Sequence, residues 1–140
     1  MSVKASFPLP PTPPIIRGSV SKDREGQPEF RRKHMRAYGS RCAITGEAHD
    51  KVLEATHIEL YFNEQSNHIQ NGLLLGVDGH RLLDAGLLAL DEGLNVLVSS
   101  KLKTTSYTQL AGKKLDTPVK ASDRSSMVAI NWHRRERFQP

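Results

Sequence analysis

The chain has 140 residues, of which 37% are hydrophobic and 25% are charged, and its formal net charge is +5. A chain of this length forms one small domain and is too short for two. No apolar run approaches the roughly 20 residues that cross a bilayer, and prolines interrupt the N-terminus where a secretory signal needs an apolar segment. We therefore predict a cytoplasmic protein that does not span a membrane.

Cys42 is the single cysteine, which excludes an internal disulfide and a zinc site built from several thiolates. Lys and Arg number 20 against 15 acidic residues, a balance typical of proteins that bind polyanions such as nucleic acid. Basic side chains gather between residues 17 and 41 and again between residues 133 and 137. Each cluster taken alone is equally consistent with a solvated basic helix face, so the charge favours nucleic acid as a partner without requiring it.

Residues 1–24 are expected to form a proline-rich arm or linker, followed by the folded domain, residues 25–140. The dense part of this arm contains Pro8, Pro10, Pro11, Pro13 and Pro14. Consecutive prolines lack backbone donors and favour an extended polyproline II path over a packed core. Such an arm could join a preceding domain or bind a partner, and the sequence does not distinguish these roles.

A helix is predicted from Pro28 to Tyr38, because proline is favoured in the first turn of a helix and Gly39 follows as a C-cap. The next segment, RCAITG, is expected to be a short extended piece that ends in a turn at Gly46. Cys42 lies in this segment. We expect its thiol to be buried and chemically inert.

Residues 51–60, KVLEATHIEL, alternate partly between apolar and polar side chains and are predicted to form a strand. A polar loop, residues 61–70, leads to Asn71-Gly72, a dipeptide that by itself favours a type I′ hairpin turn. Residues 72–77 are predicted to form a short apolar strand. Asp78 can then cap a helix that Gly86 ends.

Residues 87–99 are predicted to form a second hairpin with its turn at residues 91–93, and residues 104–115 a short helical turn and loop. An amphipathic helix is expected to start near Ser122 and close the chain. Its candidate core anchors are Met127, Ile130, Trp132 and Phe138. The order of elements predicts an α+β fold, in which a central strand–loop–strand–helix unit is flanked by an N-terminal helix, a hairpin and a C-terminal helix.

His80 and Asp84 are the residues in the predicted central helix that suggest metal chemistry. Side chains four residues apart on a helix rise from one face, so an imidazole and a carboxylate can share one divalent ion there. A His and an Asp at this spacing more often form a surface pair. His57 alone is consistent with a hydrogen-bonded structural histidine, and Asn71 alone with a turn residue.

The order and spacing of these four residues are more informative than any one of them. His57 lies in the predicted first strand, Asn71 lies in the connection, and His80 and Asp84 follow on the helix. This arrangement resembles the ββα-metal (His-Me finger) motif of the HNH endonuclease family, which includes the colicin-type nucleases. The flanking segments are similar to the HNH domains of restriction-type proteins, and the resemblance covers residues 25–138. These segments are GQPEFRRKHMRAYGSRCAITG, EATHI, NGLLLGVDGHRLLDAGLLAL and WHRRERF.

The resemblance implies a role for each of the four residues. His57 matches the general base that takes a proton from the attacking water, and Asn71 matches the residue that fixes the loop and the orientation of that base. His80 and Asp84 match the ligands of one divalent metal ion, which could be Mg, Mn, Ni, Co or Zn. The ion would bind an oxygen of the scissile phosphate and stabilise the leaving 3′ oxygen. The implied products carry a 5′ phosphate and a 3′ hydroxyl.

The sequence departs from the family pattern at Thr56, where many members have a further metal ligand immediately before the base. Water and phosphate would then complete the coordination shell, which predicts weak metal binding and some freedom of metal choice. Gly79 stands where related proteins more often have a larger residue, and a glycine there weakens a helix by about 1 kcal/mol relative to alanine. His68 is the reserve candidate for a ligand. The other histidines, His34, His49 and His133, are expected to be surface or structural residues.

The function that the resemblance implies is a DNA endonuclease of a restriction or defence system. Cutting both strands would favour a homodimer, and a separate or fused domain would supply sequence specificity. One alternative is a non-catalytic basic DNA-binding module, which would have no need of His57 as a base. The other is the nuclease domain of a secreted toxin. The target sequence, any dependence on modified bases and the physiological metal are not determined by the sequence.

Overall fold

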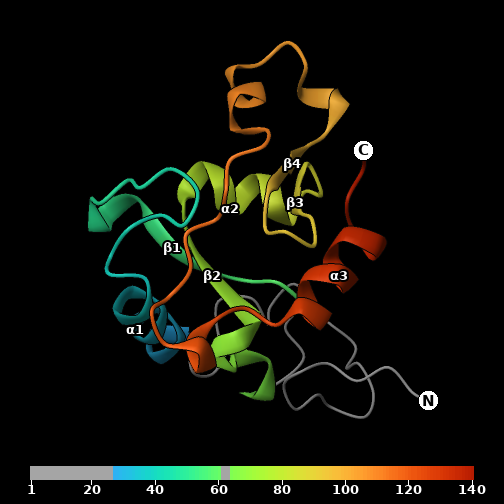
Figure 1. Cartoon of the computed structure of the whole chain (residues 1–140). Coiled ribbons are helices and arrows are strands. Elements are labelled where there is room, and N and C mark those ends of the chain that lie inside the picture. Colours follow the sequence, from blue (N-terminus) through green and yellow to red (C-terminus); the bar gives the residue numbers. More distant parts are fainter. Residues whose placement is uncertain (1–26, 61–63) are drawn as a thin grey trace, which may run out of the picture.

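The computed structural model describes residues 27–60 and 64–140, so the expected proline-rich arm, residues 1–24, lies outside the described residues. The centre of the described structure is an antiparallel hairpin of strands β1 (Leu53–His57) and β2 (Gly72–Gly76). Helix α1 (Gln27–Ala37) packs on one side of the hairpin and helix α2 (Val77–Asp84) on the other (Figure 1). This is the predicted α+β arrangement. Within the described ranges, no helix combines the length and apolarity that crossing a membrane requires.

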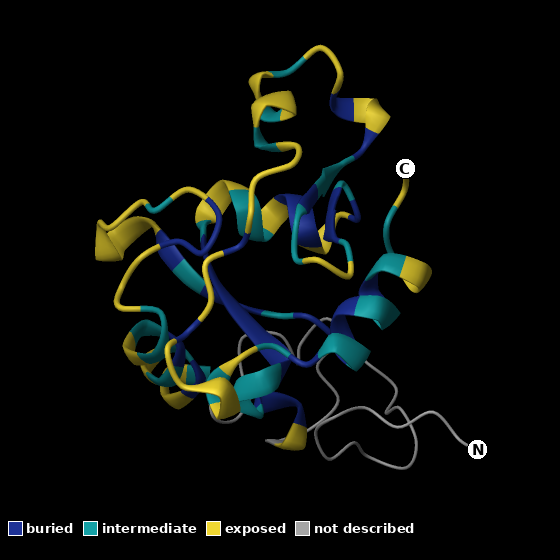
Figure 2. Cartoon of the chain, in the orientation of Figure 1, coloured by how far each residue is buried: buried dark blue, intermediate teal, exposed yellow. Residues whose placement is uncertain are grey.

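Strand β2 forms the middle of the core, and its three leucines, Leu73, Leu74 and Leu75, are fully or almost fully buried. Successive side chains of a strand point to opposite faces, so a run of buried residues needs cover on both faces. Helices α1 and α2 supply that cover, and Figure 2 shows the strand buried along most of its length. The register pairs His57 with Gly72 and Leu53 with Gly76. Asn71 therefore lies next to the hairpin, and the predicted alternative of a tight Asn-Gly turn is wrong.

The predicted first helix is confirmed to within one residue at each end, with Pro28 in its first turn. Phe30 and His34, one turn apart on α1, are completely buried against the hairpin. The chain leaves the helix through Gly39 at a φ of +63°, a conformation that glycine adopts without strain. The helix thus holds two ring side chains in the core. His34, expected to be surface or structural, is structural.

The predicted extended piece after α1 is wrong, because residues 42–46 form a turn closed by the bond from the Gly46 amide to the Cys42 carbonyl oxygen. The amides of Ile44 and Thr45 also donate to Cys42 Sγ at 3.4 Å. Cys42 is buried and unpaired, as predicted for an inert thiol. The turn at Gly46 has a φ of +81° and is confirmed.

Helix α2 ends at Gly86, as predicted, with a φ of +77°. Its predicted N-cap is wrong: the cap position is Gly76, which makes no side-chain bond, and Asp78 lies inside the first turn. The hydroxyl of Tyr107 donates to Asp78 Oδ2 at 2.8 Å, so the carboxylate binds a distant segment rather than its own helix start. A tertiary contact decided the conformation of Asp78.

The second hairpin, β3 (Leu88–Leu90) and β4 (Val96–Val98), is confirmed. Asp91 Oδ1 accepts from the amides of Gly93 and Asn95 and closes the turn. The predicted helical turn after it is the short 3₁₀ segment Ser106–Leu110. The hydrophobic core therefore continues from the central hairpin into the second hairpin.

The C-terminal helix α3 (Met127–Glu136) packs on β3 and begins five residues later than the first predicted residue, Ser122. Its N-cap is Ser126, whose side chain accepts from the Ala129 amide. Among the four predicted anchors, Ile130 is fully buried, whereas Met127, Trp132 and Phe138 are only partly buried. The helix starts later than predicted because the side chain of Ser126, four residues after Ser122, accepts a hydrogen bond from a backbone amide of the first turn.

His133 of α3 is a buried structural histidine whose Nε2 donates to the Leu83 carbonyl oxygen at 3.0 Å. Burial lowers its pKa below the ordinary 6.5, so the folded protein favours the neutral ring. The unfolded chain then binds the proton more readily. The stability from this residue is complete above about pH 6.5 and is lost as the pH falls towards the lower folded pKa.

We therefore expect the contribution of His133 to the free energy of unfolding, measured by urea titration, to fall between pH 7.5 and pH 5. His133→Gln keeps an amide donor towards Leu83 and removes the titrating ring, so its free energy of unfolding should depend less on pH than that of the wild type. An equal slope in the two proteins would contradict the assignment. His34, whose pKa burial also lowers, accounts for part of the slope that remains.

Candidate active site

His80 lies on α2 between two carboxylates. Its Nδ1 lies 2.6 Å from Glu54 Oε1 on β1, and its Nε2 lies 3.1 Å from Asp84 Oδ2, one turn along the same helix. Side chains four residues apart on a helix share a face, which explains the second contact. Glu54 reaches His80 because α2 packs directly on the strand that carries it. The imidazole is therefore fixed at both nitrogens.

The two carboxylates raise the pKa of His80, with the hydrogen bond to Asp84 as the main cause and that to Glu54 as a further one, while partial burial opposes them. Metal-ligating histidines commonly donate one ring N–H to a carboxylate, which fixes the tautomer and directs the other nitrogen at the ion. Glu54 stands in that relation to His80 Nδ1, and Nε2 already faces the Asp84 carboxylate. The donor set fits a divalent cation that replaces the proton on Nε2.

His80, Asp84 and Glu54 line an open surface hollow of about 470 Å³. The Asp84 side chain is 60% exposed and that of His80 27%, so a phosphate of a large substrate could reach both. Within residues 27–60 and 64–140, no group of three His, Cys, Asp or Glu side chains is arranged to hold a metal ion. A cation here would take two ligands from these residues and complete its shell with water or substrate oxygens.

His57, at the end of β1, has two ring contacts. Its plane is parallel to that of Phe30 on α1, with 4.1 Å between the ring centroids and 5° between the planes. Its Nε2 lies 2.8 Å from Asn67 Oδ1. The side chain is half-buried, so the ring is held but still reaches the surface.

Asn71 is completely buried and binds the chain on both sides of the loop that follows β1. Its Oδ1 accepts from the Glu59 amide at 2.8 Å, and its Nδ2 donates to the Ser66 carbonyl oxygen at 2.9 Å. Its backbone carbonyl accepts from the Ile58 amide, next to His57. The side chain is not exposed to solvent. Its hydrogen bonds join the two ends of this loop, which lie next to His57 and Asn67 in the sequence.

The four sequence-predicted residues thus form two pairs on the two faces of the hairpin. His80 and Asp84 pair with each other on the face that α2 covers, and Asn71 supports the segment that begins at His57. The His57 side chain points to the face that α1 covers, because it stacks on Phe30. On β1, Glu54, which contacts His80, lies three residues before His57.

Sequence reasoning missed three contributors. Glu54 could have been found from strand periodicity, since it lies two residues before Thr56 and therefore on the same face of β1. Asn67 and Phe30 left no signal, because their contacts with His57 arise only when separate segments fold together. Thr56, at the departure from the family pattern, is completely buried.

The other histidines near the site have structural roles. His68 Nδ1 accepts from the Gln70 amide at 3.2 Å and caps the short 3₁₀ turn Ile69–Asn71. His49 does the same for the Lys51 amide before β1. The expectation that His49 is a surface or structural residue is confirmed.

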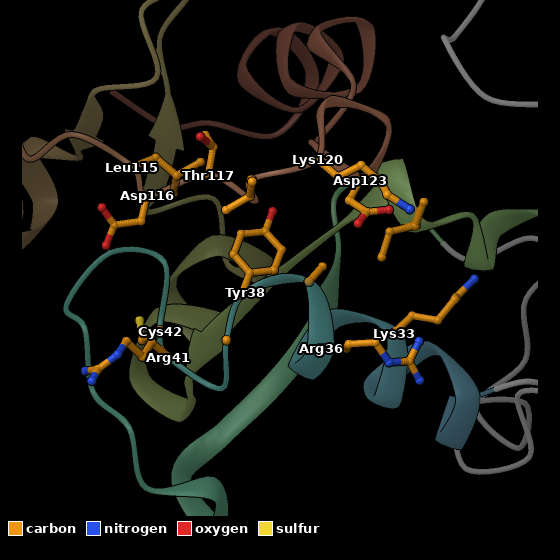
Figure 3. A pocket seen from close by; sticks show the side chains of 14 residues that line it. Lys33, Arg36, Tyr38, Arg41, Cys42, Leu115, Asp116, Thr117, Lys120 and Asp123 are labelled. Atoms are coloured by element: carbon orange, nitrogen blue, oxygen red, sulfur yellow. The ribbon is translucent and has the colours of Figure 1, made fainter.

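A larger groove, of about 980 Å³, lies between the end of α1 and residues 115–123 (Figure 3). Lys33, Arg36, Arg41 and Lys120 line it together with Asp116 and Asp123. Tyr38 forms its wall, and burial raises the pKa of this phenol to about 12. None of the four predicted site residues lines this groove, whereas His80 and Asp84 line the smaller hollow.

The chain is similar to known proteins in one segment of its sequence and in its fold. Residues 42–91 match the family described as HNH endonuclease. Among solved structures, the modification-dependent TagI restriction endonuclease matches at a TM-score of 0.55 and 16% sequence identity, over 77% of this chain and 37% of that one. This chain thus spans little more than a third of that protein's length, and at this identity the likeness shows the fold alone. A search of curated proteins finds no significant match.

The matched segment begins at Cys42 and ends at Asp91, so it contains both strands of the central hairpin, α2 and all four predicted site residues. HNH nucleases generally use a divalent metal ion, and the family implies DNA as substrate. Residues 42–91 therefore match an HNH endonuclease domain, and HNH endonucleases are nucleases, that is, phosphodiester hydrolases.

Proposed function

We propose that this domain is a metal-dependent endonuclease that hydrolyses DNA to leave a 5′ phosphate and a 3′ hydroxyl. The observation that carries the proposal is the pairing of His80 with Asp84 at 3.1 Å, on a helix packed against the strand that ends in His57. The family match supports the same reading. We assign residues 25–140 to the nuclease domain and residues 1–24 to an arm outside it.

His57 acts as the general base. Imidazole accepts protons near neutral pH, and proton transfer by a positioned side chain contributes typically ~10²–10⁴-fold to a rate. His57 takes a proton from a water molecule, the water oxygen attacks phosphorus, and the bond from phosphorus to the 3′ oxygen breaks. Solvent returns a proton to that oxygen. Asn71 holds the loop that positions the base and does not itself touch the substrate.

His80 and Asp84 would hold the divalent ion, with Glu54 fixing the orientation of the imidazole. When bound, the ion supplies Lewis-acid stabilisation of the charge that develops on the phosphate and on the leaving oxygen. With two protein ligands the site would bind weakly and accept several metals, among them Mg, Mn, Ni, Co and Zn.

We further propose that the domain cleaves DNA in a restriction or defence system in the cytoplasm. The solved restriction endonuclease that shares its fold is described as modification-dependent, and the same dependence is a hypothesis for this chain. A single site per chain would favour a homodimer for cutting both strands, with specificity supplied by a separate or fused domain.

Incubation with supercoiled plasmid tests the proposal. We expect no cleavage in EDTA, and nicking or linear product when Mg²⁺ or Mn²⁺ replaces the chelator. Asp84→Ala should abolish this metal-dependent cleavage, because the ion keeps one protein ligand. Equal cleavage in EDTA and in metal would exclude the mechanism.

A metal-binding measurement without DNA separates a lost ligand from a lost fold. Calorimetric titration with Mn²⁺ should show one weak site in the wild type and none in Asp84→Ala. Glu54→Ala should weaken binding about 10–100-fold, the usual cost of removing the residue that orients a ligating histidine. Glu92→Ala, which removes a carboxylate from the turn between β3 and β4, is the matched control and should bind as the wild type does.

A further inference from the structure

Two side chains from outside β1 hold the imidazole of His57. Phe30 comes from α1, which lies outside the segment that matches the family, and Asn67 comes from the loop after β1. Phe30 covers one face of the ring and Asn67 contacts one edge. A ring with its face and its edge both occupied cannot rotate freely about either side-chain torsion.

The Phe30 ring is itself closely packed. It is completely buried, and the ring of His34 lies against it at a centroid distance of 4.4 Å. On the hairpin side, an added Cβ at Gly72 would lie 2.6 Å from Phe30 Cζ, so the ring fills the space that the missing side chain leaves. A fixed aromatic plane 4.1 Å from the imidazole prevents His57 from tilting.

The contact with Asn67 favours one of the two neutral tautomers of His57. Its Oδ1 can only accept a hydrogen bond, so the neutral imidazole donates from Nε2 across the 2.8 Å contact. Nδ1 is then the nitrogen with the lone pair. Asn67 is almost completely buried, and its backbone carbonyl accepts from Lys33 Nζ at 2.9 Å.

One face of α1 makes all these contacts. Phe30, Lys33 and His34 stand at positions i, i+3 and i+4, which adjoin on a helix surface. Phe30 stacks on His57, Lys33 binds Asn67, and His34 Nε2 lies 3.0 Å from the Ile69 carbonyl oxygen. The helix thus holds the base and, at two points, the segment that carries Asn67.

We propose that Phe30 and Asn67 are positioning residues that hold His57 as the Nε2–H tautomer, with Nδ1 as the nitrogen that accepts the proton of water. This rests on the proposed role of His57 as the base. When Nδ1 takes the proton, the Nε2–H stays on Asn67 Oδ1, and the hydrogen bond becomes stronger because its donor is now charged. The proton, the attacking oxygen and the leaving 3′ oxygen are then those of the hydrolysis described above.

Nitrogen NMR of protein labelled with ¹⁵N-histidine tests the tautomer without DNA or metal. Above the pH at which the ring titrates, we expect the wild type to show a protonated Nε2 and a lone-pair Nδ1 for His57. Asn67→Ala should show a mixture of both tautomers, because the acceptor is gone. A pure Nδ1–H tautomer in the wild type would overturn the proposal, as would an unchanged tautomer in Asn67→Ala.

Kinetics of plasmid cleavage test the consequence. Asn67→Ala should lower kcat about 10-fold with little change in KM, since binding of DNA does not use this bond. Asn67→Asp keeps an acceptor at the same place and adds a negative charge that stabilises the protonated ring. It should recover kcat and move the acid limb of the pH–rate profile upward by about one unit. An acid limb that stays in place would show that the residue does not act through His57.

Phe30→Leu tests the ring contact. It removes the aromatic plane and keeps an apolar side chain, so kcat should fall several-fold while the protein still folds. Ile130→Val, a core substitution on α3, is the matched control and should cost about 0.5–1.5 kcal/mol of stability with kcat unchanged. If both variants lost kcat equally, Phe30 would act only as a residue of the hydrophobic core and not as a positioning residue for His57. Should cleavage by the wild type not depend on His57 at all, the proposed function fails, whereas the NMR result still decides the tautomer.

Discussion

His57→Ala is expected to lower the rate of DNA cleavage by about 10²–10⁴-fold, the contribution typical of a positioned general base. The variant should bind DNA as tightly as the wild type, because the ring contacts Phe30 and Asn67 within the protein rather than contributing charge to the surface. Metal binding should also persist, since His80 and Asp84 lie on the opposite face of the hairpin. The measurement is the initial rate of loss of supercoiled plasmid at saturating metal, with DNA affinity measured in EDTA.

His49→Ala is the matched control for this experiment. His49 is exposed and caps the short turn before β1, so the same substitution should leave cleavage unchanged. A His57→Ala rate within a few-fold of the wild type would remove His57 from the mechanism. His57→Gln fills more of the space beside Phe30 than alanine does. A loss of activity in this variant as well would show that the loss in His57→Ala does not come from misfolding.

Gly72→Ala is expected to give the largest loss of stability among single substitutions in the central hairpin. The backbone at Gly72 has a φ of −154°, which any residue adopts, so the cost comes from the added methyl alone. That methyl would collide with His34 Nε2 and lie 2.6 Å from Phe30 Cζ. Both rings are completely buried and have no free space to enter, and overpacking of this kind typically costs about 1–3 kcal/mol or more.

The free energy of unfolding from urea titration measures this effect. Gly79→Ala is the matched control with the opposite expected sign. The added methyl would lie 3.6 Å from Leu75 Cβ, an ordinary contact, and alanine is favoured over glycine inside a helix by about 1 kcal/mol. If Gly72→Ala is as stable as the wild type, α1 must be able to move away from the hairpin. Cleavage should then still fall, because Phe30 moves with the helix.

Local signals in the sequence predicted most of the secondary structure. Gly39, Gly46 and Gly86 end helices or turns at positive φ, and each was predicted as a stop. Asp91 closes the second hairpin by accepting from its own turn. These features depend on contacts within a few residues, which is why periodicity and turn chemistry reveal them.

The errors arose where distant segments compete with local preference. Asp78 was predicted to cap α2, yet its carboxylate accepts from Tyr107. Asn71-Gly72 was weighed as a tight turn, yet Asn71 is buried and binds Glu59 and Ser66 across the loop. Residues 42–46 close on the Cys42 sulfur instead of extending. In each case a polar group found a partner that the local sequence does not show.

The sequence by itself predicted the resemblance to HNH endonucleases that residues 42–91 show, the order of elements and the spacing that puts His80 and Asp84 one helical turn apart. It could do so because the i, i+4 relation on a helix and the alternation of a strand follow from backbone geometry alone. Only the tertiary structure decided that Glu54 contacts His80, that Asn67 contacts the Nε2 edge of His57, and that Phe30 covers its ring. Those contacts join residues 10 to 27 positions apart in the sequence, and they form only when α1, the hairpin and α2 pack around one core.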